Sequence, residues 1–380
     1  MRHKVVHKKY LRSLSGTAME LESFEEKGEH VMAGILKGDG GQWFPIVDGV
    51  PCFLRGALRP DLSWFEKKYD LSPCNSLAAA GNRDTKESKE QALTNKTFSD
   101  KWRRFRNYGM EKPHQEFLFT WYCKKLGLSG IDDLKSFYRN MRLVLEVGPG
   151  SGFNTRFIAE NTSGQVFAAD ISDAAFTAFE NTEDLYNCHV IQADLMDLPF
   201  AEEFFDFIIA DGVLHHTPDT KKAAFELYRK LRPGGKFFFY VYKKMGPARQ
   251  FCDSYLRERF SRLDPEACYS ACKGLTELGR ELSQLSAEIN LEEGVPLLGI
   301  PPGKHNLQRL VYYNFLKCFW NDAFDFGTNN MVNFDWYHAH TAWQHTEAEV
   351  KGWIEELGVR EYAFHDANPN GISVLLTKPS

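Results

Sequence analysis

LVLEVGPGSG, at residues 143–152, is the stretch that decides the fold of this chain. Its first half is apolar without alternation, which predicts a parallel β-strand that is covered on both faces. The strand carries one acid, Glu146, and a glycine turn follows it. Gly148, Gly150 and Gly152 allow positive φ angles and let a ligand approach the bare backbone. The stretch therefore predicts a buried strand that leads into a ligand-binding turn.

The spacing of the glycines argues against a dinucleotide as the ligand of this turn. A dinucleotide-binding turn has the pattern G-x-G-x-x-G. Here Phe153 stands where that pattern requires its last glycine, which disfavours an NAD dehydrogenase. A helix is expected to begin at about Asn154. A glycine turn alone is weak evidence, so the segments after it must decide the class of protein.

Four further apolar segments follow at the spacing of alternating strands and helices. In nucleotide-binding doubly wound folds, an acid at the end of the second strand accepts the ribose hydroxyls. The second and third segments of this chain each carry an acid near the end, as the first does. The four segments are QVFAAD (165–170), HVIQADL (189–195), FDFIIADGVLHH (205–216) and LRPGGKFFFY (231–240).

These landmarks, in this order between Leu143 and Tyr242, resemble those of the class I S-adenosylmethionine (SAM)-dependent methyltransferases of type 11 or 12. The resemblance implies an α/β fold with a doubly wound, seven-stranded, mostly parallel sheet, the Rossmann-like methyltransferase fold. It implies SAM as the cofactor. The implied activity is transfer of a methyl group to an O, N or C nucleophile.

The resemblance also assigns residues to the cofactor. Glu146 is expected near the methionine ammonium, and Asp170 is expected to accept the ribose hydroxyls with Ile171 against adenine. Asp194 is expected to take the adenine amino proton, with the Leu195 amide at a ring nitrogen. A helix N-cap is the alternative for each acid, and it stays open for Asp170. The remaining predicted cofactor-binding residues are Phe98, Trp102, Gly148, Pro149, Gly150, Gly152, Asn154 and Asp211.

Histidines are the candidate catalytic residues, because a hydroxyl acceptor must lose a proton near neutral pH. His215 and His216 follow the fourth strand, and a structural or cofactor-side pair is the alternative interpretation. A second group, DWYHAH at 335–340, combines aromatic residues with His338 and His340, which we expect to face the substrate as alternative bases. No metal site is predicted, because no third ligand is identifiable near these histidines.

The N-terminal part is predicted to form two units. Residues 1–57 form a small β-rich module, in which Asp48-Gly49 between apolar runs indicates a hairpin. The module resembles a zinc-ribbon-like unit that precedes the catalytic domain in some methyltransferases. Residues 34–41 lack the cysteine pairs of that unit, so we predict a module without metal ligands.

Residues 58–140 are predicted to form a linker and N-terminal helices. The resemblance to small-molecule methyltransferases implies that these helices cover the cofactor, and an ordinary amphipathic helix on the sheet is the alternative. The polar run 81–89 reads as linker. Residues 98–140 read as helical, with Phe98, Trp102 and Phe105 on one face.

The remaining boundaries follow the strand pattern. Residues 141–244 are the predicted SAM-binding core, and residues 336–380 are its C-terminal part, with a helix capped at Thr346 and two closing strands. Residues 245–335 interrupt the core as a helical insertion beside the carboxyl ends of the strands, where ligands bind in open α/β sheets. We expect this insertion to act as a lid, substrate or dimer element. Its expected helices span 250–262, 266–289 and 308–319.

Composition excludes some classes of protein. The net charge is −5, which argues against nucleic acid as a partner. Two local basic clusters read as solvated faces, and they comprise Lys4, Lys8, Lys9 and Arg12, and then Lys101, Arg103, Arg104 and Arg106. No apolar run is long enough for a transmembrane helix. The eight cysteines are scattered, which favours a reducing cytoplasm.

The sequence as a whole predicts a cytoplasmic methyltransferase of biosynthesis that acts on a small-molecule metabolite, with a homodimer through the insertion as an option. Two alternatives stay open. One is an RNA methyltransferase that uses the N-terminal module as an RNA grip, and the other is a non-catalytic SAM-binding partner subunit.

Overall fold

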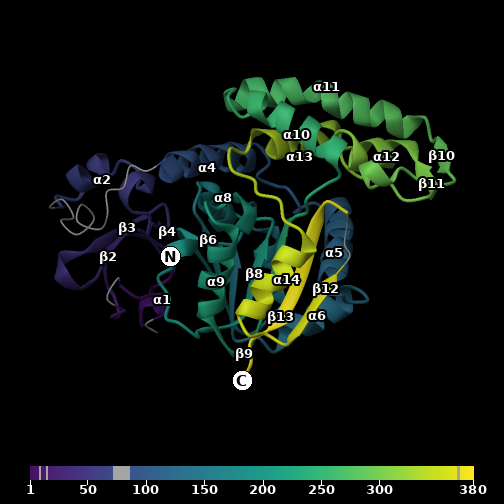
Figure 1. Cartoon of the computed structure of the whole chain (residues 1–380). Helices are drawn as coiled ribbons and strands as arrows, with labels where there is room; N and C mark the ends of the chain where they lie inside the picture. Colours follow the sequence, from purple (N-terminus) through teal and green to yellow (C-terminus); the bar gives the residue numbers. More distant parts are fainter. Residues whose placement is uncertain (8–9, 14–15, 72–85, 366–368) are drawn as a thin grey trace.

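A seven-stranded sheet forms the centre of the computed structural model, which describes residues 1–7, 10–13, 16–71, 86–365 and 369–380 (Figure 1). The strand order is β12-β13-β9-β8-β5-β6-β7. β13 runs antiparallel to both neighbours, whereas β5 to β9 are mutually parallel, so the predicted fold class is confirmed. The strands are β5 (Leu143–Val147), β6 (Gln165–Asp170), β7 (Cys188–Gln192), β8 (Phe205–Asp211), β9 (Leu231–Tyr242), β12 (Glu361–His365) and β13 (Gly371–Thr377).

Helices cover both faces of the sheet, and the residues that they bury form two apolar clusters. α5 (Lys112–Leu126), α6 (Ile131–Arg139), α7 (Phe153–Asn161) and α8 (Ala174–Glu180) share one cluster with the sheet. α9 (Thr220–Lys230) and α14 (Glu347–Glu356) pack on the other face. Because central strands such as β5 and β8 are buried on both faces, their sequences are apolar without alternation, as predicted.

Two helix starts follow local sequence rules. The Asp219 side chain accepts from the Lys222 amide and caps α9. Thr346 and Glu349 form the predicted capping box of α14.

The N-terminal module contains a four-stranded antiparallel sheet. Asp48 and Gly49 adopt φ angles of 47° and 83° between the last two strands, so the predicted hairpin forms. The module adjoins the edge of the central sheet, where the Phe53 amide donates to the Gln192 carbonyl at 2.7 Å. Its elements are α1 (His3–His7), β1 (Glu20–Lys27), β2 (His30–Lys37), β3 (Trp43–Val47) and β4 (Val50–Pro51), with α2 (Ser63–Lys68) after it.

The buried side chains of this module continue into the apolar cluster beneath α9 and α14. The part of the chain that the structure describes contains no group of three residues able to hold a metal ion. The resemblance to a zinc-ribbon-like unit stays a prediction.

Helix α4 (Lys86–Arg104) begins earlier than expected, since the predicted helical stretch started at 98 and residues 86–89 belonged to the predicted linker. The buried side chains of α4 before Phe98 are polar, namely Gln91, Thr94 and Thr97, so no apolar period reveals this part of the helix. Phe105 directly follows α4, and its amide still donates to the Lys101 carbonyl at 3.0 Å, so it continues the last turn of the helix. The predicted linker residues 81–85 lie outside the described residues.

The insertion lies above the sheet next to α4, as Figure 1 shows. It consists of α10 (Pro247–Phe260), α11 (Pro265–Gln284), the hairpin of β10 (Glu288–Leu291) and β11 (Gly303–Asn306), α12 (Leu307–Asn314) and α13 (Phe326–His338). Short 3-10 turns occur at η1 (Asp39–Gly41), η2 (Gly56–Leu58) and η5 (Pro296–Leu298). None of the helices that the structure describes is long and apolar enough to cross a membrane.

The hairpin and α13 were not predicted. The buried face of α13 is rich in asparagine, and Asn330 and Asn333 form hydrogen bonds with Thr276 of α11. A helix that buries amides lacks the apolar period on which the sequence analysis relied. The predicted boundary at 335 therefore falls inside α13.

Candidate active site

A cavity of about 690 Å³ lies at the carboxyl ends of the parallel strands, between the sheet, α4, α5 and the insertion. This volume is in the range of small-molecule sites, ~300–1,000 Å³. The structure brings together most of the residues that the sequence assigned to the cofactor. Those that line the cavity are Phe98, Trp102, Glu146, Gly148, Pro149, Asp170, Ile171, Asp194, Leu195 and Asp211, together with His216.

The glycine turn packs directly against α4. Gly148, Gly150 and Gly152 all have positive φ, at 67°, 58° and 82°. A Cβ atom on Gly150 would lie 2.5 Å from the indole of Trp102. Gly150 therefore does not line the cavity itself, but its lack of a side chain allows Trp102 to reach the turn.

We expect Gly150→Ala to lower thermal stability more than Gly212→Ala. Both residues have positive φ, at 58° and 76°, so alanine strains the backbone in both by about 1 kcal/mol. Only Gly150 adds a collision with Trp102, because a Cβ atom on Gly212 meets nothing within 4 Å. Thermal unfolding of the two variants separates these effects, and equal losses would show that Trp102 moves aside freely.

Glu146 is buried at the end of β5, where two side chains of α7 hold its carboxylate. Asn154 donates through Nδ2 at 2.8 Å, and Thr155 donates through Oγ1. Burial raises the pKa of Glu146 to about 7, although these hydrogen bonds lower it. Asn154 thus lies behind Glu146 as a positioning residue and does not line the cavity.

Asp170 is buried at the end of β6, and Asp194 is half-buried in the segment after β7. Asp170 Oδ1 accepts from the amide and the hydroxyl of Ser172, at 2.9 and 2.7 Å. Burial raises the pKa of Asp170 to about 6, against these hydrogen bonds. Asp194 caps η3 (Leu195–Asp197) by accepting from the Met196 amide, and burial raises its pKa too. Asp194 therefore does both things that the sequence left open. It caps a helical turn, and it also lines the cavity.

The two histidines in η4 (Leu214–His216) lie in different places, and only His216 lines the cavity. His216 lines the cavity, and its Nδ1 donates to the Thr341 carbonyl at 2.7 Å, which leaves Nε2 unprotonated in the neutral ring. Burial lowers the pKa of His216 to about 4. His215 is fully buried behind it, stacked on Tyr242 with ring centroids 3.7 Å apart, and does not line the cavity.

His338 and His340 do not face the cavity, which corrects the interpretation of them as substrate-facing bases. Both ring nitrogens of His338 are occupied, by Thr97 Oγ1 at 2.8 Å and the Leu263 carbonyl at 3.1 Å. His340 is exposed beyond the end of α13. From the same stretch, Asp335 and Trp336 do line the cavity.

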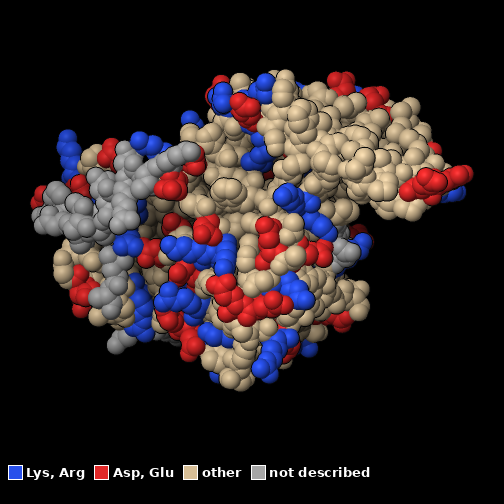
Figure 2. Space-filling view, viewed as in Figure 1, with Lys and Arg blue, Asp and Glu red and all other residues tan. Residues whose placement is uncertain are grey.

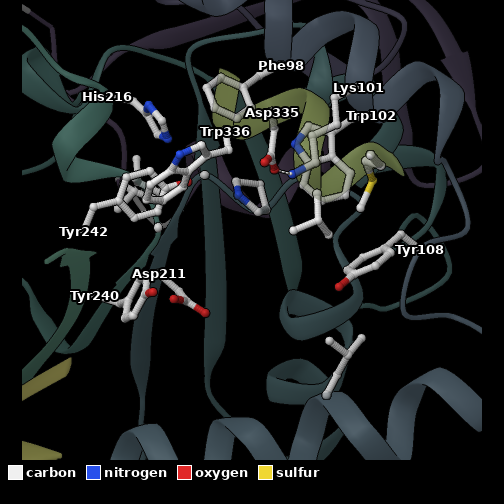
Figure 3. A pocket seen from close by; sticks show the side chains of 18 of the residues that line it. Phe98, Lys101, Trp102, Tyr108, Asp211, His216, Tyr240, Tyr242, Asp335 and Trp336 are labelled. Carbon is white, nitrogen blue, oxygen red and sulfur yellow. Dashed lines mark hydrogen bonds and ion pairs between the residues drawn. The ribbon is translucent and has the colours of Figure 1, made fainter. Parts of the chain in front are cut away.

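The buried cations of the site were not predicted from the sequence. Lys125 of α5 donates to both oxygens of Asp211, at 2.6 and 2.7 Å, so Asp211 is ion-paired in addition to lining the cavity. Lys101 of α4 pairs with Asp335 of α13 at 2.5 Å. Figure 3 shows this second pair across the top of the cavity, with Asp211 beside Tyr240 below it. Lysines in helical segments carry no sequence signal for burial, because a solvated face is the usual interpretation.

Comparison with known proteins identifies the class. Residues 145–239 match the family model for a methyltransferase domain. The chloroplastic 2-methyl-6-phytyl-1,4-hydroquinone methyltransferase of Spinacia oleracea is 32% identical over 121 residues, which cover 31% of this chain and 35% of that protein. The mitochondrial arginine-hydroxylase NDUFAF5 of Homo sapiens is 29% identical over 135 residues, which cover 36% and 38%. The structure of Burkholderia thailandensis 1,6-didemethyltoxoflavin-N1-methyltransferase is 13% identical with a TM-score of 0.43, covering 78% of this chain and 92% of that one.

The doubly wound sheet and its acid-lined cavity define an α/β fold with a ligand site at the carboxyl edge. The family match makes residues 145–239 a methyltransferase domain, in agreement with the resemblance to the SAM-dependent methyltransferases that the sequence motifs carry. The chain spans 35% and 38% of the lengths of the two curated relatives named above. The activity and substrate of the whole protein are therefore matters of proposal.

Proposed function

We propose that this protein transfers a methyl group from SAM to a small-molecule acceptor. The observation that carries the proposal is the convergence of Glu146, Asp170 and Asp194, from three successive strand ends, on one cavity beside the glycine turn. Carboxylates suit the ammonium, the ribose hydroxyls and the adenine amino group of SAM, which are cationic or hydrogen-bond donors. The donor set of the cavity therefore fits the cofactor.

When bound, SAM would supply an activated methyl group on a sulfonium leaving group. The residues of the chain would hold the acceptor in line and exclude water. Aromatic side chains from α4, β9 and α13 line the cavity for this purpose, among them Phe98, Tyr242 and Trp336 (Figure 3). We propose His216 as the group that accepts the proton of the acceptor, through the Nε2 atom that its bond to Thr341 leaves free.

The acceptor class is part of the proposal. A relative named for methylation of a hydroquinone supports a small metabolite. A second relative is named as an arginine-hydroxylase, so turnover of a methyl acceptor is the measurement that distinguishes the two reactions.

RNA is less well supported as an acceptor. The cluster of Lys101, Arg103, Arg104 and Arg106 is neutralised by ion pairs with Asp335, Asp100, Glu266 and Glu180. Blue and red side chains also alternate over the face in Figure 2, without a continuous basic area.

Calorimetry with SAM and with its demethylated product, S-adenosylhomocysteine, tests the proposal. We expect both to bind at one site per chain. Absence of binding by either molecule would refute the proposed function. Binding without turnover of any acceptor would instead favour the alternative of a non-catalytic partner subunit.

The affinity for SAM should rise with pH. The raised pKa values of Glu146 and Asp170, about 7 and 6, mean that both carboxyls are largely protonated at pH 5.5. A cationic ligand favours the ionised forms, so its binding must release these protons at low pH. We expect the affinity to fall by about tenfold or more between pH 7.5 and pH 5.5.

Calorimetry at several pH values measures this dependence. Glu146→Gln should flatten the part of the curve near pH 7, because glutamine does not titrate. An affinity that is constant, or that increases toward low pH, would contradict the placement of the cation near Glu146.

Two further properties stay predictions. A homodimer through the insertion is supported by the exposed side chains of Phe251, Tyr255 and Leu297. A cytoplasmic location stays a prediction from the sequence, and the relatives named above are chloroplastic and mitochondrial.

A further inference from the structure

Among the buried cations that line the cavity, Lys317 of the insertion has no counter-charge among the described residues. Five lysine or arginine side chains are buried in the described part of the chain. Four of them pair with a carboxylate, namely Arg2 with Glu29, Lys101 with Asp335, Lys125 with Asp211 and Arg249 with Asp253. Lys317 is the fifth, with 5% of its surface exposed. Its ammonium forms no ion pair or hydrogen bond with any described residue.

The carboxylates near Lys317 already form ion pairs with other cations. Asp335 and Asp253 are the nearby carboxylates that favour its charged form, and Lys101 and Arg249 oppose it. Asp335 is held by Lys101 at 2.5 Å, and Asp253 is held by Arg249 at 2.9 Å. Burial lowers the pKa of Lys317 to about 7 as a result. A buried ammonium without a partner is costly, so a site of this kind is suited to an anion that arrives from outside.

The surroundings of Lys317 indicate the shape of that anion. Its ammonium lies over the indole of Trp336, 3.8 Å from the ring centroid. Tyr312, Tyr313 and Phe319, from the same insertion, line the cavity with it. This wall is aromatic and cationic, and Arg309 adds a second cation to it.

The carboxylates Glu146, Asp170 and Asp194, from the core, line the same cavity. These acids suit the cationic cofactor. Lys317, whose neighbouring acids are already paired, suits a ligand that brings its own negative charge.

We propose that Lys317 binds the carboxylate of the methyl acceptor, and that the acceptor is a small aromatic carboxylic acid whose ring packs on the aromatic wall of the insertion. This inference rests on the proposed function and specifies its substrate class. The carboxylate of the cofactor itself is the competing partner for Lys317, and the experiment separates the two.

The experiment measures binding to the full-length protein by calorimetry, first of S-adenosylhomocysteine and then of probe acids in its presence. The probes are benzoate, 2-naphthoate and indole-3-carboxylate, each paired with its uncharged amide. We expect at least one acid to bind about tenfold or more tightly than its amide. Lys317→Met should remove this preference, Lys317→Arg should retain most of it, and neither should change the affinity for S-adenosylhomocysteine.

Each other result overturns the inference. If Lys317→Met weakens S-adenosylhomocysteine, the lysine serves the cofactor carboxylate. If Arg309→Met removes the acid preference and Lys317→Met does not, the assignment to Lys317 is wrong. If no acid is preferred by the wild-type protein at millimolar concentration, the substrate class is wrong, while the proposed function stands as long as S-adenosylhomocysteine binds.

Discussion

Replacing Asp170 by alanine is expected to reduce the affinity for SAM by about a hundredfold or more. Asp170 is buried at the end of β6 and lines the cavity. A carboxylate that accepts from two vicinal hydroxyls makes two charge-assisted hydrogen bonds, each of which contributes about 1.5–3 kcal/mol. Alanine removes both acceptors and leaves the ribose without a partner in a desolvated site.

A neighbouring acid provides the matched control. Asp173 is three residues further along, is exposed and does not line this cavity. Asp173→Ala should therefore leave the affinity within about threefold of the wild type. Calorimetry gives both affinities, and circular dichroism checks that both variants are folded. If the Asp170→Ala variant bound SAM with the affinity of the wild type, Asp170 at the end of β6 would not be the residue that holds the ribose.

The grouping of the acids could be predicted because it depends on topology alone. Parallel strands end at the same edge of a sheet, so Glu146, Asp170 and Asp194 must lie near one another once the strands are recognised. The glycine turn follows from its sequence in the same way, since positive φ at Gly148 and Gly150 requires no knowledge of distant residues.

The cationic parts of the site could not be predicted, because they depend on packing between distant segments. Lys125 and Asp211 lie on α5 and β8, and nothing local marks either of them as a partner of the other. The stretch 335–340 shows the same limit. It was read as a continuous substrate-facing segment, but the fold presents Asp335 and Trp336 to the cavity and directs His338 to Thr97.

Replacing Lys125 by methionine is expected to destabilise the protein by about 3–5 kcal/mol. The side chain of Lys125 is 1% exposed and that of Asp211 is 12% exposed, so the variant leaves a largely buried carboxylate without its cation. The ammonium also lies 3.5 Å from the ring centroid of Trp121, and methionine gives up that cation–π contact. Urea unfolding measures the loss, and a second substitution, Asp211→Leu, should recover most of it.

Lys317→Met is the matched comparison, because the same substitution is made in nearly the same environment. Both lysines are buried, and each ammonium lies over an indole, at 3.5 Å from Trp121 and 3.8 Å from Trp336. They differ in that only Lys125 has a carboxylate partner among the described residues. Removing an unpaired buried charge relieves a desolvation cost, so Lys317→Met should be neutral or stabilising. A loss as large as that of Lys125→Met would mean that Lys317 is paired within the folded chain, and Lys317 would then have no free charge to offer an acid.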